Sequence, residues 1–171
     1  ANLFGSAVNR ALLNVFFLTD RNKKQITTHQ SSNKIENVGV VGAGIMGQGI
    51  ASANLRRQLP TLMNDAATDA LQRGMQSALE QASYSRELKG PDVEQTLALA
   101  PLLNPALDLT EMRHCDLVIE AAVERPDVKK NIFSNLEAVV DPTAVLATNT
   151  STIPIDELAS VLSHPERFLG I

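Results

Sequence analysis

The chain has one cysteine, little excess charge and no long apolar run, and each of these features narrows its class. Cys115 alone among 171 residues excludes an internal disulfide and a multi-cysteine metal site, so we expect it to fill a small buried space in a reducing compartment. The formal charge of -4, with Lys and Arg scattered, argues against nucleic acid or an anionic membrane surface as partner. No apolar run approaches the ~18 residues that span a bilayer. A cytoplasmic location is the simplest prediction, with an organellar matrix or a peroxisome still open.

Two regions are expected from the composition along the chain. Apolar residues at helical spacing predict a helix over residues 4–18, capped by Ser6 and ending near Asp20. Residues 20–34 are polar and typical of a linker, so the folded domain should start near Ile35. The first residue is Ala and not Met, from which we expect a piece of a longer protein. The predicted organisation is an N-terminal helix and linker over 1–34 and one domain over 35–171.

Strand and helix patterns alternate regularly after Ile35. Strands are predicted at 38–41, 61–64, within 101–109, and at 117–121, 144–148 and 168–171. Helices are predicted at 46–57, 67–88 with Gly90 as the stop signal, 92–98, 126–140 with Pro126 in the first turn, and 155–162. Apolar strands that alternate with helices predict an α/β protein with a doubly wound parallel sheet covered on both faces.

The stretch 35–51 reads as a buried strand that enters a glycine turn and opens a helix. Gly42 would allow the tight turn, Gly44 the close approach of a pyrophosphate, and Gly47 the packing of the new helix on its strand. The N–H groups of the first helical turn would then face the phosphates. With nine glycines in the chain, a chance match in a structural turn is the alternative. The context favours a Rossmann-like dinucleotide-binding fold with the helix of residues 4–18 appended.

Asp65 ends the next apolar run, eighteen residues after Gly47. A carboxylate there can accept both ribose hydroxyls of adenosine and would repel a 2′-phosphate. Neighbouring Ala66 and Ala67 provide no arginine for that phosphate. We therefore predict NAD in preference to NADP, with a helix cap as the alternative role for Asp65.

Three segments in the same order are similar to the 3-hydroxyacyl-CoA dehydrogenase family, and the similarity covers about residues 35–171. They are GAGIMGQGIA at 42–51, DLVIEAAVE at 116–124 followed by Lys129, and NTSTIPI at 149–155. Residues 1–33 more loosely resemble the connecting segment of the multifunctional fatty-acid oxidation α subunit. In those proteins this segment joins an enoyl-CoA hydratase domain to the dehydrogenase, which also implies a thiolase subunit as partner.

The resemblance implies a role for further residues beside Gly42, Gly44, Gly47 and Asp65. Ile45 and Met46 would line the pyrophosphate turn, Ala122 and Val123 the nicotinamide half, and Glu124 and Lys129 the nicotinamide ribose. Asn149 and Ser151 would meet the reacting centre, with Ser151 hydrogen-bonded to the 3-oxygen of the substrate. The alternatives are an exposed ion pair for Glu124 and Lys129, and ordinary helix-entry chemistry for residues 149–154.

In the family, a histidine that acts as general acid and base follows directly after the position of Ile171, and a helical second domain closes over the acyl-CoA. His29, His114 and His164 are expected to be solvated and not catalytic. We therefore expect the 171 residues to bind NAD without completing the reaction of the parent enzyme, the oxidation of L-3-hydroxyacyl-CoA. Two alternatives stay open: the NAD domain of another β-hydroxyacid dehydrogenase, and a non-catalytic NAD-sensing or interaction module.

The predicted N-terminal helix carries more apolar residues than docking on a single surface needs. Leu12, Leu13 and residues 15–18 place large apolar side chains on more than one face of the helix. Left in water, such side chains favour association with another chain. We therefore predict self-association through this segment.

Overall fold

The structure is a computed structural model that describes residues 6–25 and 34–171, and the chain divides into two units, Ala1–Lys34 and Ile35–Ile171. The described part of the first unit is helix α1 (Ala7–Gln25). Ser6 caps it as predicted, because its Oγ accepts the N–H of Asn9 at 3.1 Å. The helix continues past the predicted end near Asp20, since the following residues include no Gly or Pro and are mostly the good helix formers Arg, Lys and Gln. Phe4 and most of the predicted linker (residues 26–33) lie outside the described residues.

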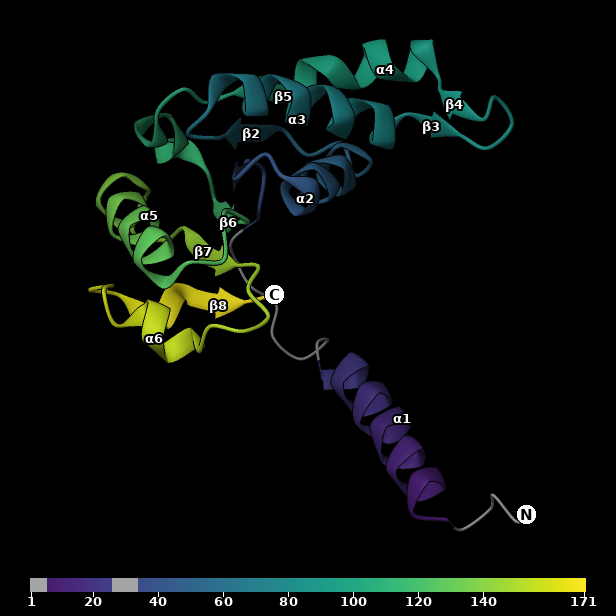
Figure 1. Ribbon diagram of the computed structural model, residues 1–171, viewed down its shortest axis with the longest axis vertical. Coiled ribbons are helices and arrows are strands. Elements are labelled where there is room, and N and C mark those ends of the chain that lie inside the picture. The colour runs from purple at the N-terminus through teal and green to yellow at the C-terminus, as the bar shows by residue number, and fades with distance from the viewer. Residues whose placement is uncertain (1–5, 26–33) are drawn as a thin grey trace. The chain divides into compact units, whose positions relative to one another are not determined.

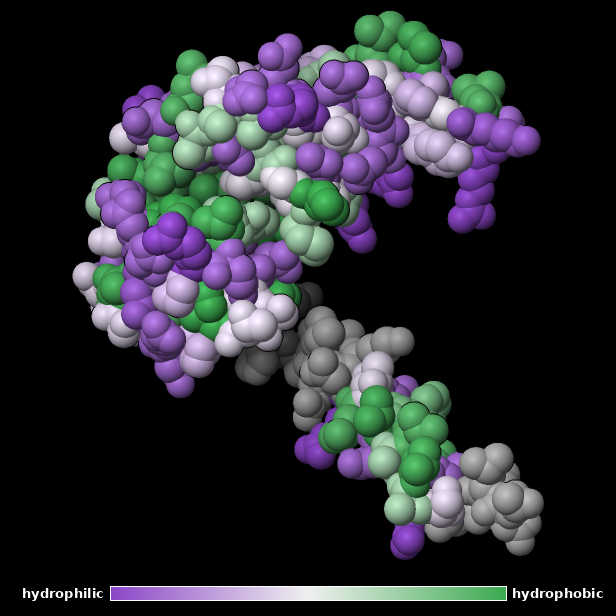
Figure 2. All heavy atoms as spheres, in the orientation of Figure 1, coloured by the Kyte–Doolittle hydropathy of each residue, from purple (hydrophilic) through white to green (hydrophobic). Residues whose placement is uncertain are grey.

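Helix α1 carries large exposed apolar side chains. They are Val8, Leu12, Leu13, Val15, Phe16, Phe17 and Leu18, each at least 45% exposed. The apolar side chains form a green stretch along this helix in Figure 2. The rings of Phe16 and Phe17 lie edge to face, with 5.6 Å between their centroids.

The second unit is built on a six-stranded parallel sheet in the order β5-β2-β1-β6-β7-β8. Its strands are β1 (Val38–Val41), β2 (Thr61–Asn64), β5 (Leu103–Pro105), β6 (Leu117–Glu120), β7 (Val145–Thr148) and β8 (Phe168–Gly170). All six strands of this sheet were predicted from the sequence. The order shows that the chain winds outward from β1 through β2 to β5, and then from β6 outward in the other direction. The point of reversal therefore lies between β1 and β6.

Helices cover both faces of this sheet (Figure 1). One face carries α2 (Ile45–Leu55), α3 (Thr68–Ala82) and α4 (Val93–Leu99), which pack on side chains such as Val40 and Met63. The other carries α5 (Pro126–Val139), α6 (Ile155–Ala159) and the 3₁₀ helix η2 (Leu109–His114), which pack on Val41 and Leu146. Val40 and Val41 belong to different cores because successive strand residues point to opposite faces. This confirms the doubly wound α/β prediction.

Three predicted helices are too long, and the first of them, predicted over 46–57, ends at Leu55. The helix predicted over 67–88 ends at Ala82, and a small hairpin of β3 (Tyr84–Ser85) and β4 (Gly90–Pro91) follows it. A contact that the local pattern does not contain caps this end: the guanidinium of Arg56 donates to the carbonyls of Gln81 and Ala82, which have no partner within the helix. The prediction that Gly90 stops this helix was therefore wrong. Helix α6 likewise ends at Ala159 instead of continuing to residue 162.

Cys115 lies in the core as predicted, 2% exposed and beside Gly39. Burial, together with the neighbouring Asp116 carboxylate, raises the pKa of its thiol to about 11. None of the helices in the described ranges is long and apolar enough to cross a membrane.

Candidate functional site

The glycine turn lies where β1 ends and α2 begins. Gly42 has a φ of +107°, and a Cβ there would come within 2.5 Å of the carbonyl oxygen of Ala121. A Cβ on Gly47 would meet the carbonyl oxygen of Gly42 at 1.8 Å, so only glycine lets α2 pack this closely. A Cβ on Gly44 would meet nothing within 4 Å, and no side chain caps α2. The turn therefore offers open space and the N–H groups of a helix N-terminus.

Asp65 follows β2 and fixes the glycine turn from the side. Its Oδ2 accepts the N–H of Ala43 at 2.8 Å, and its Oδ1 accepts the N–H of Ala67 at 3.0 Å. The N-cap residue of α3 is Ala67, and no side chain caps that helix. The alternative role of Asp65 as a helix cap was therefore wrong. Each carboxylate oxygen keeps further acceptor capacity on a half-buried side chain.

The register brings four strand ends to one edge of the sheet. Val41 of β1 is paired with Asn64 of β2 and with Glu120 of β6, and Glu120 is paired with Thr148 of β7. The loops that follow these strands carry most of the predicted site residues. A cleft of about 700 Å³ opens at this edge, lined by Gly42, Gly44, Asp65, Ala121, Ala122, Val123, Asn131 of α5 and their neighbours.

Glu124 and Lys129 converge as predicted, with 3.3 Å between carboxylate and ammonium. Glu124 also accepts hydrogen bonds from the hydroxyls of Thr150 and, at 2.9 Å, Thr152. The bond from Thr150, followed by those from Thr152 and Lys129, lowers the pKa of Glu124 from 4.5 to about 2. Lys129 is fully buried, so the alternative of an exposed surface pair was wrong for this residue.

Glu120 is the functional candidate that the sequence reasoning missed. Its carboxylate, fully buried at the end of β6, lies 2.7 and 2.8 Å from the ammonium of Lys129. It also accepts the N–H of Ala122 and the hydroxyl of Thr148, each at 2.7 Å. A signal was available, because a carboxylate at the end of an apolar strand needs a partner when it is buried.

The remaining predicted residues lie at or beside the same edge of the sheet. Ile45 and Met46 are exposed in the first turn of α2, and Ala122 and Val123 line the cleft. The backbone N–H of Asn149 donates to the carbonyl of Glu120 at 2.8 Å, which holds the loop after β7 against the end of β6. Ser151 is exposed in that loop. The cap of α6 is Pro154, so residues 149–152 do not cap the helix.

The two histidines that the structure describes lie at the opposite edge. His114 ends η2, just before the amino end of β6, and His164 precedes the amino end of β8. Both are exposed, and His164 lies 3.2 Å from the carboxylate of Glu166. Neither can act on a ligand at the carboxyl ends of the strands.

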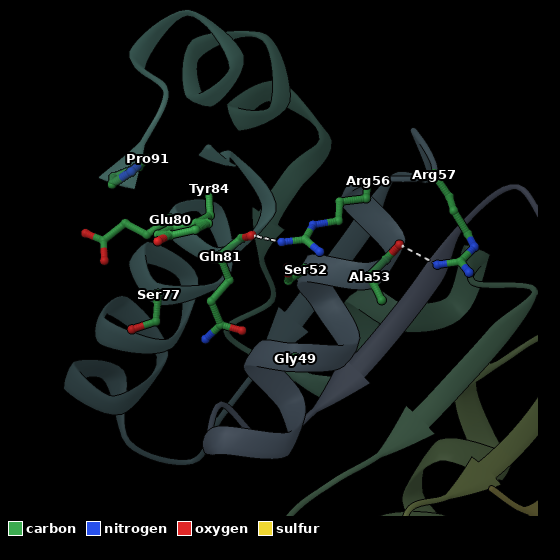
Figure 3. Close-up of a pocket in the computed structure, with 10 residues that line it drawn as sticks. All are labelled: Gly49, Ser52, Ala53, Arg56, Arg57, Ser77, Glu80, Gln81, Tyr84 and Pro91. Carbon is green, nitrogen blue, oxygen red and sulfur yellow. Dashed lines mark hydrogen bonds between the residues drawn. The ribbon is translucent and has the colours of Figure 1, made fainter. Parts of the chain in front are cut away.

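A second cleft, of about 670 Å³, lies between α2 and α3, away from the glycine turn. Figure 3 shows it, with Arg56 directed at Gln81 across the two helices and Arg57 turned back to Ala53. These contacts hold the two arginines in place. This cleft lacks the strand ends and the helix N-terminus that a dinucleotide needs.

Three observations indicate that a dinucleotide fits the first cleft. The open space at Gly44 and the uncapped N-terminus of α2 suit a pyrophosphate. Asp65 stands at the end of β2, where an adenosine ribose is bound in such folds. The reversal of strand order between β1 and β6 gives the crevice in which ligands of open α/β sheets lie.

Comparisons with known proteins agree with this assignment. Residues 37–171 match the family described as 3-hydroxyacyl-CoA dehydrogenase, NAD binding domain. FadB2 of M. tuberculosis is 37% identical with a TM-score of 0.75, and the match covers 81% of this chain and 49% of that one. The (S)-3-hydroxybutyryl-CoA dehydrogenase of Ralstonia eutropha is 33% identical with a TM-score of 0.72, and the match covers 80% of this chain and 48% of that one.

A third solved structure is the dehydrogenase part of multifunctional enzyme 1 from C. elegans. It is 27% identical with a TM-score of 0.72, and the match covers 85% of this chain and 33% of that one. The chain thus spans about half the length of the first two relatives and a third of this one. On the match over residues 37–171 and the geometry of the cleft, the chain belongs to the 3-hydroxyacyl-CoA dehydrogenase family and contains its NAD-binding domain.

Proposed function

We propose that this chain is the cofactor-binding part of an enzyme that oxidises L-3-hydroxyacyl-CoA to 3-ketoacyl-CoA with NAD. The observation that carries the proposal is the single cleft in which the glycine turn, Asp65 and the loop after β6 meet. The nicotinamide ring supplies a hydride acceptor when it is bound there. In this proposal residues 35–171 form the NAD-binding domain, and residues 1–34 form a helix and a connecting segment.

Each predicted site residue has a task that its position supports. Gly42, Gly44 and Gly47, with Ile45 and Met46, form the pyrophosphate turn, and Asp65 accepts the adenosine ribose hydroxyls. Small Ala122 and neighbouring Val123 leave room for the nicotinamide half at the end of β6. Glu124, with Lys129 behind it, holds the nicotinamide ribose. Asn149 and Ser151 hydrogen-bond the reacting centre, with Ser151 at the 3-oxygen of the substrate.

The proton that leaves the substrate hydroxyl needs a base at this edge of the sheet. The two described histidines lie at the other edge, so the base is proposed to belong to a part of the enzyme outside these 171 residues. A missing acid or base removes about 10² to 10⁴ in rate. The chain by itself is therefore expected to bind NAD and to show no measurable turnover.

The test of this function uses the chain and the complete protein. Calorimetric titration of the chain should show NAD binding, and the complete protein should reduce NAD with 3-hydroxybutyryl-CoA but not with free 3-hydroxybutyrate. Ser151→Ala in the complete protein should lower turnover and leave NAD affinity nearly unchanged. Turnover of the free acid at the rate of the thioester would instead assign the chain to a β-hydroxyacid dehydrogenase of another substrate class.

The proposal also includes the other domains of the enzyme, its partner subunit and its compartment. A multifunctional parent with an enoyl-CoA hydratase domain and a thiolase partner, in the cytoplasm, is supported by the resemblance of residues 1–33 to a connecting segment. The relative from C. elegans is itself described as part of a multifunctional enzyme. Purification of the complete protein and assays for hydratase and thiolase activity test this setting directly.

Self-association is proposed for helix α1. Seven large apolar side chains on this helix are at least 45% exposed, and burying each of them fully would contribute about 1.5 to 3 kcal/mol. Two chains can bury them by isologous pairing or by exchange of helices. Light scattering should show an oligomer for residues 1–171 and a monomer for residues 34–171. A monomer in both cases contradicts the proposal.

A further inference from the structure

We propose that Glu120 is a positioning residue that orients the nicotinamide end of the cofactor site through Lys129 and Glu124. The inference deepens the proposed function and rests on it, because it takes NAD to lie across the ends of β1 and β6. Glu120 does not itself line the cleft. Its effect on the cofactor must therefore pass through the groups that it holds.

The carboxylate of Glu120 is held by partners from three elements. The N–H of Ala122 comes from the loop after β6, the hydroxyl of Thr148 from the end of β7, and the ammonium of Lys129 from α5. All donor–acceptor distances lie between 2.7 and 2.8 Å. Ala122 lines the cleft, so its backbone position is tied directly to this carboxylate.

Lys129 connects Glu120 to Glu124, because its ammonium contacts both carboxylates. Lys129 and Glu124 lie 3.3 Å apart, and Lys129 is fully buried whereas the side chain of Glu124 is 40% exposed. Glu124 in turn accepts hydrogen bonds from the hydroxyls of Thr150 and Thr152. One continuous network therefore joins the loop after β6 to the loop after β7, which are the two loops that carry the residues proposed for the nicotinamide end.

Energetics favour a positioning role over a purely stabilising one. Two buried charges lose their hydration, and a well-packed apolar pair of similar volume is often as stable or more stable. What an apolar pair cannot do is fix a backbone N–H and two hydroxyls at hydrogen-bond distance. The charges of Glu120 and Lys129 therefore specify the geometry of the two loops.

The test compares NAD with ADP, which contains the adenosine and the diphosphate but no nicotinamide ribose or ring. Calorimetric titrations measure both dissociation constants for the 171-residue chain and its variants, and thermal unfolding shows that each variant is folded. Glu120→Gln puts an amide N–H donor against the ammonium of Lys129. We expect NAD to bind about tenfold more weakly, as for the loss of one charged hydrogen bond, and ADP to stay within about twofold.

Two further variants keep the test valid if Glu120→Gln does not fold. The double variant Glu120→Gln with Lys129→Met removes both charges and should restore stability without restoring NAD affinity. Thr148→Val removes only one donor to Glu120 and should weaken NAD about threefold with ADP unchanged, since a neutral hydrogen bond is worth less than a charged one.

Glu137→Gln is the matched control. Glu137 of α5 also accepts two backbone N–H groups, from Ser163 and His164, and faces the guanidinium of Arg167, but none of these partners lines the cleft, whereas Ala122, a partner of Glu120, does. Its variant should alter the binding of NAD and ADP equally or not at all.

The outcomes separate the inference from the proposed function. A selective loss of NAD over ADP in the Glu120 and Thr148 variants, and not in the control, supports the positioning role. Folded variants with an unchanged ratio of NAD to ADP affinity overturn it, as does recovery of NAD affinity together with stability in the double variant. A folded wild-type chain that binds ADP but not NAD would overturn the proposed function first, and the inference with it.

Discussion

The two ends of the cleft differ in the chemical groups that form them or lie behind them. The end proposed for the adenosine uses glycines, backbone N–H groups and the carboxylate of Asp65, within a short stretch after β1 and β2. Behind the end proposed for the nicotinamide lies a network of charged and hydroxyl side chains centred on the buried pair of Glu120 and Lys129. Added volume should therefore disrupt the first end most, and loss of a charge should disrupt the second.

Gly47→Ala should give the largest effect on cofactor binding, because its Cβ would lie 1.8 Å from the carbonyl oxygen of Gly42. Helix α2 must move away, which should lower the free energy of unfolding by about 3 kcal/mol and abolish tight binding of NAD and ADP alike. Urea unfolding and calorimetric titration measure the two effects.

Variants of two other glycines, one at the start of α2 and one within it, serve as comparisons for Gly47→Ala. Gly49→Ala meets no atom within 4 Å and should stabilise the chain by about 0.5 to 1 kcal/mol. Gly44→Ala also meets no protein atom, so it should fold normally and weaken only the binding of NAD and ADP. Equal behaviour of the three variants would mean that the turn is not fixed by steric contact.

Lys129→Met should be the most damaging change at the nicotinamide end. It leaves the carboxylate of Glu120 buried without its cation, which typically costs about 3 to 5 kcal/mol. Lys130→Met is the matched control, because the neighbouring lysine pairs with Glu157 near the surface, where a pair contributes about 0 to 1 kcal/mol. Urea unfolding in which the two variants lose the same stability would contradict this account of the buried network.

Asp65→Asn tests the carboxylate proposed to accept the adenosine ribose hydroxyls. The wild-type chain should bind NAD more tightly than NADP, because the carboxylate would face a 2′-phosphate without a compensating cation. The variant keeps one oxygen as acceptor and should weaken NAD about tenfold while narrowing the difference from NADP. Titration of both cofactors gives the ratio, and equal affinities in the wild-type chain would refute the assigned role of Asp65.

The smallest effect concerns acid stability at the nicotinamide end. The pKa of Glu124 is lowered from 4.5 to about 2, so its contribution to the free energy of unfolding is complete above about pH 4.5 and is lost as the pH falls towards 2. Glu124→Gln should lower stability at neutral pH, and its difference from the wild type should shrink on acidification. Glu87→Gln, a change in the exposed turn between β3 and β4, controls for net charge. A difference that stays constant with pH would argue against the lowered pKa.

The sequence predicts the geometry of the glycine turn and the position of Asp65 well because both are local. The spacing of three glycines within six residues, and a carboxylate after the next strand, contain almost all of this geometry. The network around Glu120 brings together Lys129, nine residues away on α5, and Thr148, 28 residues away, and it depends on the packing of α5 and on the parallel register of β6 and β7. The end of α3 was likewise misplaced, and there Arg56, the residue after α2, supplies a cap that the local sequence does not contain.

Helix α3 also crosses directly over the glycine turn. A Cβ on Gly74 would lie 2.6 Å from the Cβ of Ala43, inside the turn itself. Position 74 already holds the smallest residue, so any enlargement at position 43 has no compensating reduction across the contact. Even a glycine at position 43, 31 residues away in sequence, would not make room for an alanine at position 74, because the new Cβ would still lie 2.7 Å from the backbone carbonyl oxygen of residue 43. Gly74 of α3 thus limits which side chains the glycine turn can accept without loss of the fold.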